Sequence, residues 1–367
     1  MTWDFSNPSL SPDDKQDKST KPSTLEALGW QSFFEDQIST GSLLEKPPVR
    51  VTEVHRNAVH VVGNDIETDI PSIQDVTVGD WLLFDRIHPP SSQILERKSV
   101  VKRRAPGTGR QIQLIAANID TAFIVASCNQ EFSVARIERY IALAFEAAIT
   151  PVVVLTKADL LDTSINYEEE AKSISKSVAV VVLDARGDEP RTKLAQWCKR
   201  GETVAFLGSS GVGKSTLTNS LAENQYIKTQ TIREDDGRGR HTTTSRQLYL
   251  VPNGCLVLDT PGMRELQLSN ASSGINDVFA DILDLSTQCK FNNCQHKTEP
   301  GCAITKGVKD GDIDPARLER WRKLITEEAS NTTSFAERKL KAREKLLLVK
   351  PKPKQKKNKY PKKKPDQ

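Results

Sequence analysis

Hydrophobic and polar positions alternate over short distances between Val49 and about Arg104. Turn sequences at 63–65 and 78–80 separate these segments. Alternation with a period of two predicts half-buried strands, and about five of them in so short a stretch predict a small antiparallel barrel. An OB-fold is favoured, with an SH3-like barrel as the alternative. Residues 25–38, ahead of this region, have the apolar spacing of a helix, whereas residues 1–23 are predicted to be disordered.

From about Asp120 the pattern changes to continuous apolar runs that alternate with amphipathic stretches. Buried strands are predicted at 121–126, 151–155, 178–183, 203–207 and 255–258, and helices at 135–148, 168–177 and 216–222. Strands that are apolar on both faces and alternate with helices are typical of a parallel sheet covered on both sides. This part of the chain is therefore predicted to have an α/β fold.

Charge is distributed unevenly. Residues 336–367 contain 14 Lys or Arg and 3 Asp or Glu, a net charge of +11. Since the whole chain has a net charge of +4, residues 1–335 have a net charge of −7. This tail ends in a Lys/Pro tract that cannot form a core. An acidic body with a strongly basic tail indicates a polyanionic partner, and a solubilising appendage is the alternative.

No run of 18 or more apolar residues occurs, so no transmembrane helix is expected. The segment from Met1 to Lys21 has neither the basic start nor the apolar core of a signal peptide. Three of the six cysteines (Cys128, Cys198 and Cys255) are scattered over strand-like or helix-like segments, which suits a reducing compartment better than a disulfide framework. We therefore expect a cytoplasmic protein.

A glycine-rich sequence follows the apolar run at 203–207. GSSGVGKS at 208–215 matches the phosphate-binding pattern G-x-x-x-x-G-K-[ST], and it lies between a strand and a helix as that motif requires. The backbone N–H groups of such a loop wrap phosphates, Lys214 would neutralise β and γ oxygens, and Ser215 would ligate Mg²⁺. An incidental Gly/Ser loop is the alternative, which the flanking elements disfavour. The candidate residues are Gly208, Ser209, Ser210, Gly211, Val212, Gly213, Lys214, Ser215 and Thr216.

Two later segments complete the expected phosphate side of this site. In DTPG at 259–262, Asp259 is predicted to hold Mg²⁺ through water, and the amide of Gly262 to meet the γ-phosphate. The charged, glycine-rich stretch 233–244 is typical of a mobile switch, in which Thr243 is predicted to reach Mg²⁺. A plain surface loop is the alternative for that stretch.

A base-reading loop is predicted at TKAD, 156–159, about 50 residues before the phosphate loop. Asp159 can accept hydrogen bonds from the N1–H and exocyclic amine of guanine, and Lys157 can pack along the base. Thr156 stands where asparagine is usual, and the following strand-end loop at 183–185 lacks its usual serine. Guanine preference is expected, and an incidental strand-end turn is the alternative. Because small GTPases have these loops in the opposite order, the chain is predicted to be circularly permuted.

The predicted catalytic residues are Lys214, Thr243 and His241. Met263 follows Gly262 at the position where many GTPases have a glutamine that orients the attacking water, so slow intrinsic hydrolysis is expected. His241 is a candidate to orient water once the switch segment is ordered. A solvated loop histidine is an equal alternative.

Three cysteines and one histidine lie within 14 residues: Cys289, Cys294, His296 and Cys302. Three thiolates and a neutral imidazole complete a tetrahedral Zn²⁺ shell with no open position, so the ion is expected to be structural. Three buried free thiols are the alternative, which their clustering in a polar segment disfavours.

In combination, these motifs resemble the circularly permuted GTPases of small ribosomal subunit biogenesis, the RsgA/YjeQ family. The resemblance covers about residues 47–335 and includes QLIAANID at 113–120, TKADL at 156–160, GSSGVGKST at 208–216, GRHTTT at 239–244 and DTPGMRE at 259–265, besides the loop order and the cysteine spacing. It implies an OB-fold (47–108), a circularly permuted GTPase domain (109–270) and a helical zinc-binding domain (271–335). An N-terminal extension with a helix (1–46) and a basic tail (336–367) are expected on either side of these domains.

The resemblance also implies a function. A protein of this family binds the small (30S) ribosomal subunit late in maturation and leaves after subunit-stimulated hydrolysis of GTP to GDP. We accordingly expect rRNA contacts through the OB-fold, zinc domain and tail, one Zn²⁺, Mg²⁺ with GTP, no membrane, and a monomer. Thr156, the LDAR sequence at 183–186 and the two extensions depart from the family pattern. A P-loop ATPase or kinase, and an RNA-binding scaffold with a vestigial nucleotide site, are the alternatives.

Overall fold

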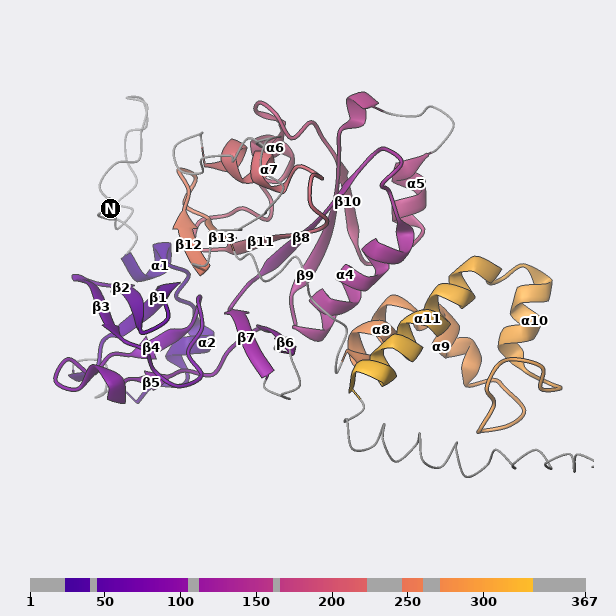
Figure 1. Cartoon of the computed structure of the whole chain (residues 1–367), viewed down its shortest axis with the longest axis horizontal. Coiled ribbons are helices and arrows are strands. Elements are labelled where there is room, and N and C mark those ends of the chain that lie inside the picture. The colour runs from indigo at the N-terminus through magenta and orange to yellow at the C-terminus, as the bar shows by residue number, and fades with distance from the viewer. Residues whose placement is uncertain are drawn as a thin grey trace, which may run out of the picture.

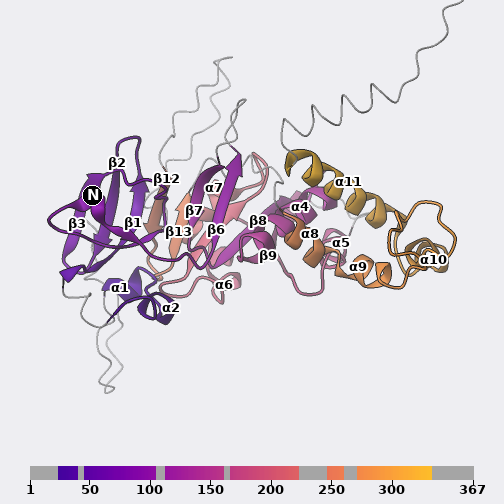
Figure 2. The same cartoon turned by 90° about the horizontal axis from the view of Figure 1, so that it is seen from below.

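The computed structural model describes residues 24–39, 45–104, 112–160, 166–222, 246–259 and 271–332. Three units lie in a row: a β-rich unit, a central sheet with helices, and a helical unit (Figures 1 and 2). His241, Thr243, Gly262 and Met263 lie outside the described residues, as do the expected disordered N-terminus and the basic tail.

The β-rich unit is antiparallel, as the period-two alternation predicts. Its elements are β1 (Pro48–Val54), β2 (Ala58–Gly63), β3 (Ile66–Pro71), β4 (Trp81–Leu83), η1 (Pro89–Ser91) and β5 (Gln93–Ile94). β1 pairs with both β2 and β4, while β3 and β5 extend the two sides. Val49, Val51, Val59, Val61 and Leu82 form its buried core.

The central sheet has the strand order β10-β9-β8-β11-β13-β12 and is parallel except for β12. The strands are β8 (Thr121–Ser127), β9 (Thr150–Thr156), β10 (Ala179–Val182), β11 (Thr203–Leu207), β12 (Arg246–Leu250) and β13 (Leu256–Asp259). Its helices are α4 (Val134–Glu146), η2 (Ala158–Leu160), α5 (Tyr167–Lys172), α6 (Glu189–Lys193) and α7 (Lys214–Leu221). α5 is shorter than the predicted helix at 168–177.

Side chains of β8 alternate between two hydrophobic cores. Phe123 and Val125 belong to the core that includes Leu217 of α7, whereas Ala122 and Ile124 belong to the core under α4 and α5. Helices therefore cover both faces of the sheet (Figure 1), and the predicted α/β class is confirmed.

Two connections join the first two units. β12 pairs with β1 in the register Glu53↔Gln247 and Val54↔Arg246, so one continuous sheet crosses both units. The ribbon of β6 (Val100–Arg104) and β7 (Ile112–Ala117) lies between them. The boundary expected between residues 108 and 109 falls between these two paired strands.

The prediction of a single helix at 25–38 is wrong. The structure has two short helices, α1 (Thr24–Ala27) and α2 (Ser32–Glu35). Gly29 between them has a φ of +86°, and a Cβ there would lie 2.5 Å from the carbonyl oxygen of Gly201. The chain turns at Gly29 because only glycine fits this close approach. Trp30 then packs against Trp81, with ring centroids 4.8 Å apart.

The helical unit contains α8 (Ser272–Val278), α9 (Ala280–Ser286), α10 (Ala303–Asp310) and α11 (Pro315–Thr332). α8 packs closely on α4, since a Cβ at Gly274 would lie 1.9 Å from the carbonyl oxygen of Ala142. The buried carboxylate of Glu138 on α4 accepts hydrogen bonds from Arg320 of α11 at 2.9 and 3.0 Å. In the part of the chain that is described, no helix has both the length and the apolar character to cross a bilayer.

Candidate nucleotide site and metal centre

The predicted phosphate-binding loop connects β11 to α7, and its backbone requires glycine. Gly208, Gly211 and Gly213 have φ angles of +140°, +80° and +103°. A Cβ at Gly208 would also lie 2.4 Å from the carbonyl oxygen of Val125 on β8. α7 begins at Lys214, and the N–H groups of a first helical turn have no partner within the helix. The loop therefore offers the backbone donors that phosphate binding needs.

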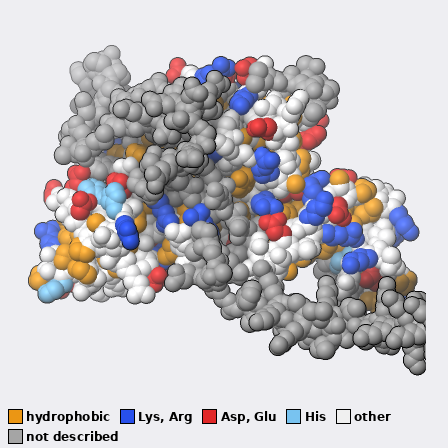
Figure 3. Space-filling model, in the orientation of Figure 1, with side chains coloured by type: hydrophobic (Ala, Val, Ile, Leu, Met, Phe, Trp, Pro, Cys, Tyr) orange, Lys and Arg blue, Asp and Glu red, His pale blue; other side chains and the backbone are white. Residues whose placement is uncertain are grey.

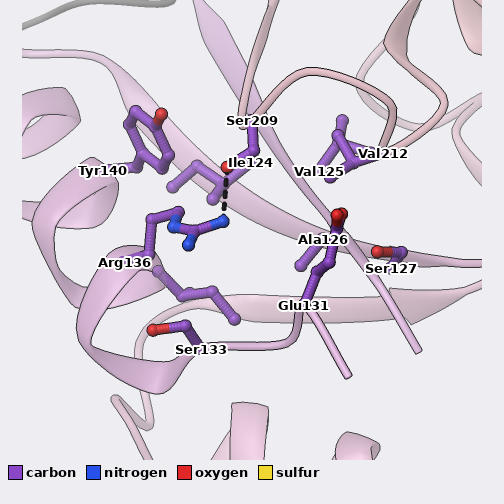
Figure 4. A pocket seen from close by; sticks show the side chains of 11 residues that line it. Ile124, Val125, Ala126, Ser127, Glu131, Ser133, Arg136, Tyr140, Ser209 and Val212 are labelled. Atoms are coloured by element: carbon purple, nitrogen blue, oxygen red, sulfur yellow. Dashed lines mark hydrogen bonds between the residues drawn. The ribbon is translucent and has the colours of Figure 1, made fainter. Parts of the chain in front are cut away.

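Two cationic side chains lie against this loop. The ammonium of Lys214 donates to the carbonyl oxygen of Gly208 at 2.8 Å and to that of Ser209. From the first turn of α4, Nη1 of Arg136 donates to Oγ of Ser209 at 2.6 Å (Figure 4). Sequence reasoning missed Arg136 because it lies 73 residues from Ser209 and belongs to no motif. Both charges favour an anion at this loop.

Thr156 joins the base-reading loop to the phosphate loop. Its side chain is fully buried at the end of β9, and its hydroxyl donates to the carbonyl oxygen of Val212 at 2.6 Å. The carbonyl oxygen of Ala126 is 3.3 Å from the same hydroxyl. Since a hydroxyl has one proton, the shorter bond to Val212 dominates. Threonine thus connects the two loops at the position where asparagine was expected.

Asp159 lies at the surface beside the loop that follows β10. Its Oδ2 accepts a hydrogen bond from Nη2 of Arg186 at 3.1 Å. Arg186 also pairs with Asp184, and its guanidinium and backbone N–H hold the pKa of Asp184 below the usual range. The LDAR sequence at 183–186 marks this loop as a departure from the family pattern. No feature of the sequence around it indicates that its arginine reaches Asp159.

The predicted base and phosphate loops meet because they follow β9 and β11, two parallel strands that lie on either side of β8. β9, β10 and β11 all point the same way, so the segments after them gather at one edge of the sheet. Lys157 has a φ of +56°, which turns the chain at this edge. Ser220 of α7 donates to the carbonyl oxygen of Ala185 at 2.7 Å, which fixes the loop after β10.

The magnesium side of the site is described only in part. Asp259 ends β13, and its backbone pairs with Gln247. The side chain of Asp259 lies outside the description, together with Gly262, His241 and Thr243. Their roles stay predictions.

The four predicted metal ligands come together between α9 and α10. A sulfur or ring nitrogen from each of Cys289, Cys294, His296 and Cys302 lies within 4.8 Å of all the others. Nδ1 of His296 is 3.5 Å from Sγ of Cys289 and 3.7 Å from Sγ of Cys302, and these sulfurs are 3.9 Å apart. A tetrahedron with metal–sulfur bonds of about 2.3 Å and a metal–nitrogen bond of about 2.0 Å has edges of about 3.5–3.8 Å. The residues therefore fit a tetrahedral metal ion.

The thiols of this cluster differ in acidity. Burial opposes ionisation of Cys302, but hydrogen bonds from Thr305 and contact with His296 outweigh it and lower the pKa to about 6. Desolvation, reinforced by the neighbouring sulfurs, raises the pKa of Cys294 to about 11. A bound cation would allow all three thiols to ionise together.

Charged side chains support the backbone around the cluster. The carboxylate of Glu299 accepts hydrogen bonds from the N–H groups of Gln295 at 3.0 Å and Lys297 at 2.8 Å. Arg322 of α11 donates to the carbonyl oxygen of His296, a residue with a φ of +59°. The ligand loop is thus held in place by side chains from within and from α11.

The loops at the carboxyl edge of the central sheet define a P-loop nucleotide hydrolase. It is circularly permuted, because the base-reading loop precedes the phosphate loop in the chain. A protein-family model described as RsgA GTPase matches residues 94–269. The small ribosomal subunit biogenesis GTPase RsgA of Mesorhizobium japonicum is 46% identical over 319 residues, covering 84% of this chain and 91% of that protein. RsgA 2 of Vibrio vulnificus is 43% identical over 322 residues, covering 87% and 92%. The chain belongs to the RsgA GTPase family and is a GTP hydrolase.

Two solved structures share this fold. YjeQ from Thermotoga maritima aligns with a TM-score of 0.55 at 24% identity, covering 76% of this chain and 97% of that one. YloQ, described as a circularly permuted GTPase, aligns with a TM-score of 0.53 at 23% identity, covering 81% and 100%. Together with the family relationship, this agrees with the predicted permuted architecture.

Proposed function

We propose that this chain binds the small (30S) ribosomal subunit during late assembly and hydrolyses GTP to GDP and phosphate when the subunit stimulates it. The two relatives compared above are named small ribosomal subunit biogenesis GTPases, and the matches cover 91% and 92% of their lengths. The choice of partner rests on that likeness. The family relationship sets aside the ATPase and kinase alternatives.

The observation that carries the nucleotide site is the hydrogen bond from Thr156 to the carbonyl oxygen of Val212, 2.6 Å long. It places the loop that would read the base against the loop that would wrap the phosphates. In this proposal Asp159 recognises guanine, Lys157 packs along the base and Lys214 neutralises phosphate oxygens. The phosphates lie against Gly208, Ser209, Ser210, Gly211, Val212, Gly213, Ser215 and Thr216.

The magnesium ion is assigned to Ser215, Thr243 and Asp259. Gly262 would donate its amide to the γ-phosphate, and His241 would orient the attacking water. These roles follow from the motif spacing and the family relationship.

The cysteine cluster is assigned one structural Zn²⁺, since three thiolates and one imidazole are the ligands that zinc prefers in closed sites. Around it, the helical unit has exposed basic side chains at Lys290, Lys297, Lys306, Lys309 and Lys323. Basic side chains are visible on this unit in Figure 3. We propose that they contact rRNA phosphates together with the β-rich unit and the basic tail. We also propose that the protein is a cytoplasmic monomer, and that its domain boundaries follow residues 46, 108, 270 and 335.

The test is to measure phosphate release from GTP with and without purified small subunits. Small subunits should increase the rate at least about tenfold, and large subunits should not. A Lys214→Ala variant should lack this activity, which shows that the measured phosphate comes from this site. Equal rates with either subunit, or with none, would overturn the proposed partner.

A further inference from the structure

We propose that Arg186 is a positioning residue for guanine recognition. It orients the carboxylate of Asp159 so that both oxygens face the N1–H and the exocyclic amine of the base. The inference rests on the proposed reading of guanine by Asp159 and adds a residue outside the motif that predicts it.

Asp184 fixes the guanidinium of Arg186 in one plane. Nε of Arg186 donates to Oδ1 of Asp184 at 3.1 Å, and Nη2 donates to Oδ2 at 3.2 Å. The backbone N–H of Arg186 donates to the same Oδ1 at 3.0 Å. Two parallel N–H···O bonds between a guanidinium and a carboxylate set orientation as well as distance. These bonds orient the guanidinium of Arg186 independently of Asp159.

From this fixed plane, Arg186 reaches the base-reading carboxylate. Its Nη2 donates to Oδ2 of Asp159 at 3.1 Å. Each carboxylate oxygen can accept two hydrogen bonds, so this contact leaves acceptor positions for both guanine donors. Because the side chain of Asp159 is 49% exposed, it would otherwise rotate freely, and that freedom would be lost on binding. The contact with Arg186 removes part of this entropic cost in advance.

The loop that carries Arg186 is itself anchored. The backbone N–H of Asp184 donates to Oε2 of Glu189 at 2.9 Å, and Ser220 of α7 donates to the carbonyl oxygen of Ala185 at 2.7 Å. α7 is also the helix that follows the phosphate loop. The position of the base-reading carboxylate is thus tied to the element that carries Lys214.

The expected effect is modest because both partners are partly exposed to solvent. Ion pairs of this kind alter equilibria by about two- to fivefold. A lysine at position 186 cannot bridge two carboxylates with a planar fork, so it should restore only part of the effect.

The experiment compares the affinities of the full chain for GDP and for inosine diphosphate, which lacks the exocyclic amine. Arg186→Ala should weaken GDP binding by about two- to fivefold and lower the ratio of GDP to inosine diphosphate affinity. Arg186→Lys should give intermediate values. As a matched control, Lys172→Ala removes a cation from an exposed pair with Glu168, 2.6 Å long, and should change neither value.

Two results would overturn the inference. An unchanged affinity ratio would show that Arg186 has no part in recognition, and tighter GDP binding by Arg186→Ala would show that the arginine competes with the base. Asp159→Asn tests the underlying site separately, since it should shift preference from GDP toward xanthosine diphosphate. If that shift occurs while Arg186→Ala has no effect, only the inference fails. If the shift is absent, the proposed base recognition fails as well.

Discussion

Replacing Thr156 by valine should weaken GDP binding, because it removes the hydroxyl that connects the base and phosphate loops. Valine has nearly the same shape, so the substitution leaves the packing around this fully buried position almost unchanged. The carbonyl oxygen of Val212 would lose a donor that lies 2.6 Å away.

The size of the effect follows from that lost donor. A buried carbonyl left without its partner costs about 1–3 kcal/mol. The bond joins two parts of the folded chain, so part of the cost lowers the free energy of unfolding. The remainder appears in binding, because GDP must align two loops that are no longer joined. We expect GDP affinity to fall about fivefold and the free energy of unfolding to fall by about 1 kcal/mol.

Fluorescence titration with a labelled GDP measures the affinity, and urea denaturation measures the unfolding free energy. Thr156→Ser is the matched control, since it keeps the hydroxyl and loses only a methyl group. Wild-type GDP affinity in Thr156→Val would refute the reasoning, whatever happens to stability.

Three further predictions concern the metal, the interface of α8 with α4, and pH. Cys302→Ser should abolish stoichiometric zinc in elemental analysis and lower the melting temperature by at least about 5 °C, because a ligand of the tetrahedral site is lost. Gly274→Ala should lower the free energy of unfolding by about 1–3 kcal/mol in urea titrations, because its Cβ would lie 1.9 Å from the carbonyl oxygen of Ala142. Gly307→Ala in α10, whose Cβ would have no contact nearer than 3.4 Å, should be neutral or slightly stabilising. Burial raises the pKa of Glu138 above its usual 4.5, so the native state binds this proton more tightly than the unfolded state. Stability from this group is therefore full below about pH 4.5 and declines as pH rises through the raised pKa, a dependence that Glu138→Gln should remove from pH-resolved denaturation curves.

Each of these has a clear contrary result. Full zinc content in Cys302→Ser would exclude its sulfur as a ligand. Equal stabilities of Gly274→Ala and Gly307→Ala would show that α8 and α4 can separate without cost. A pH dependence that survives in Glu138→Gln would assign the titration to another group.

The fold was predictable where local patterns decide it. Apolar runs at 121–126 and 203–207 indicated buried strands, and the structure places strands at Thr121–Ser127 and Thr203–Leu207. Alternation indicated the β-rich unit in the same way. The helix at 25–38 was misjudged because Gly29 turns there to accommodate Gly201, a residue far away in sequence.

The site was predictable where a motif fixes backbone geometry. The phosphate loop was predictable because its residues are consecutive in a known pattern, GSSGVGKS at 208–215. The metal centre was predictable because its four ligands lie within 14 residues of one another. The contacts of Arg136 and Arg186 were not predicted, since these long side chains reach partners that only the folded sheet brings near. Thr156 departs from the usual asparagine of the base-reading motif, yet its hydroxyl makes the bond that joins the two loops.

The pairing of β12 with β1 has a practical consequence for anyone who wishes to study the units separately. The two strands are almost two hundred positions apart in sequence, yet Glu53 and Val54 at the end of β1 pair with Gln247 and Arg246 at the start of β12. A fragment ending at residue 108 would keep the pairing of β1 with β4 but would leave the end of β1 at Glu53 and Val54 without its partner strand, and it would also separate β6 from β7. Bare strand margins of this kind invite pairing with other molecules. Fragments cut there would be prone to self-association, so binding experiments are better done by point substitution in the intact polypeptide.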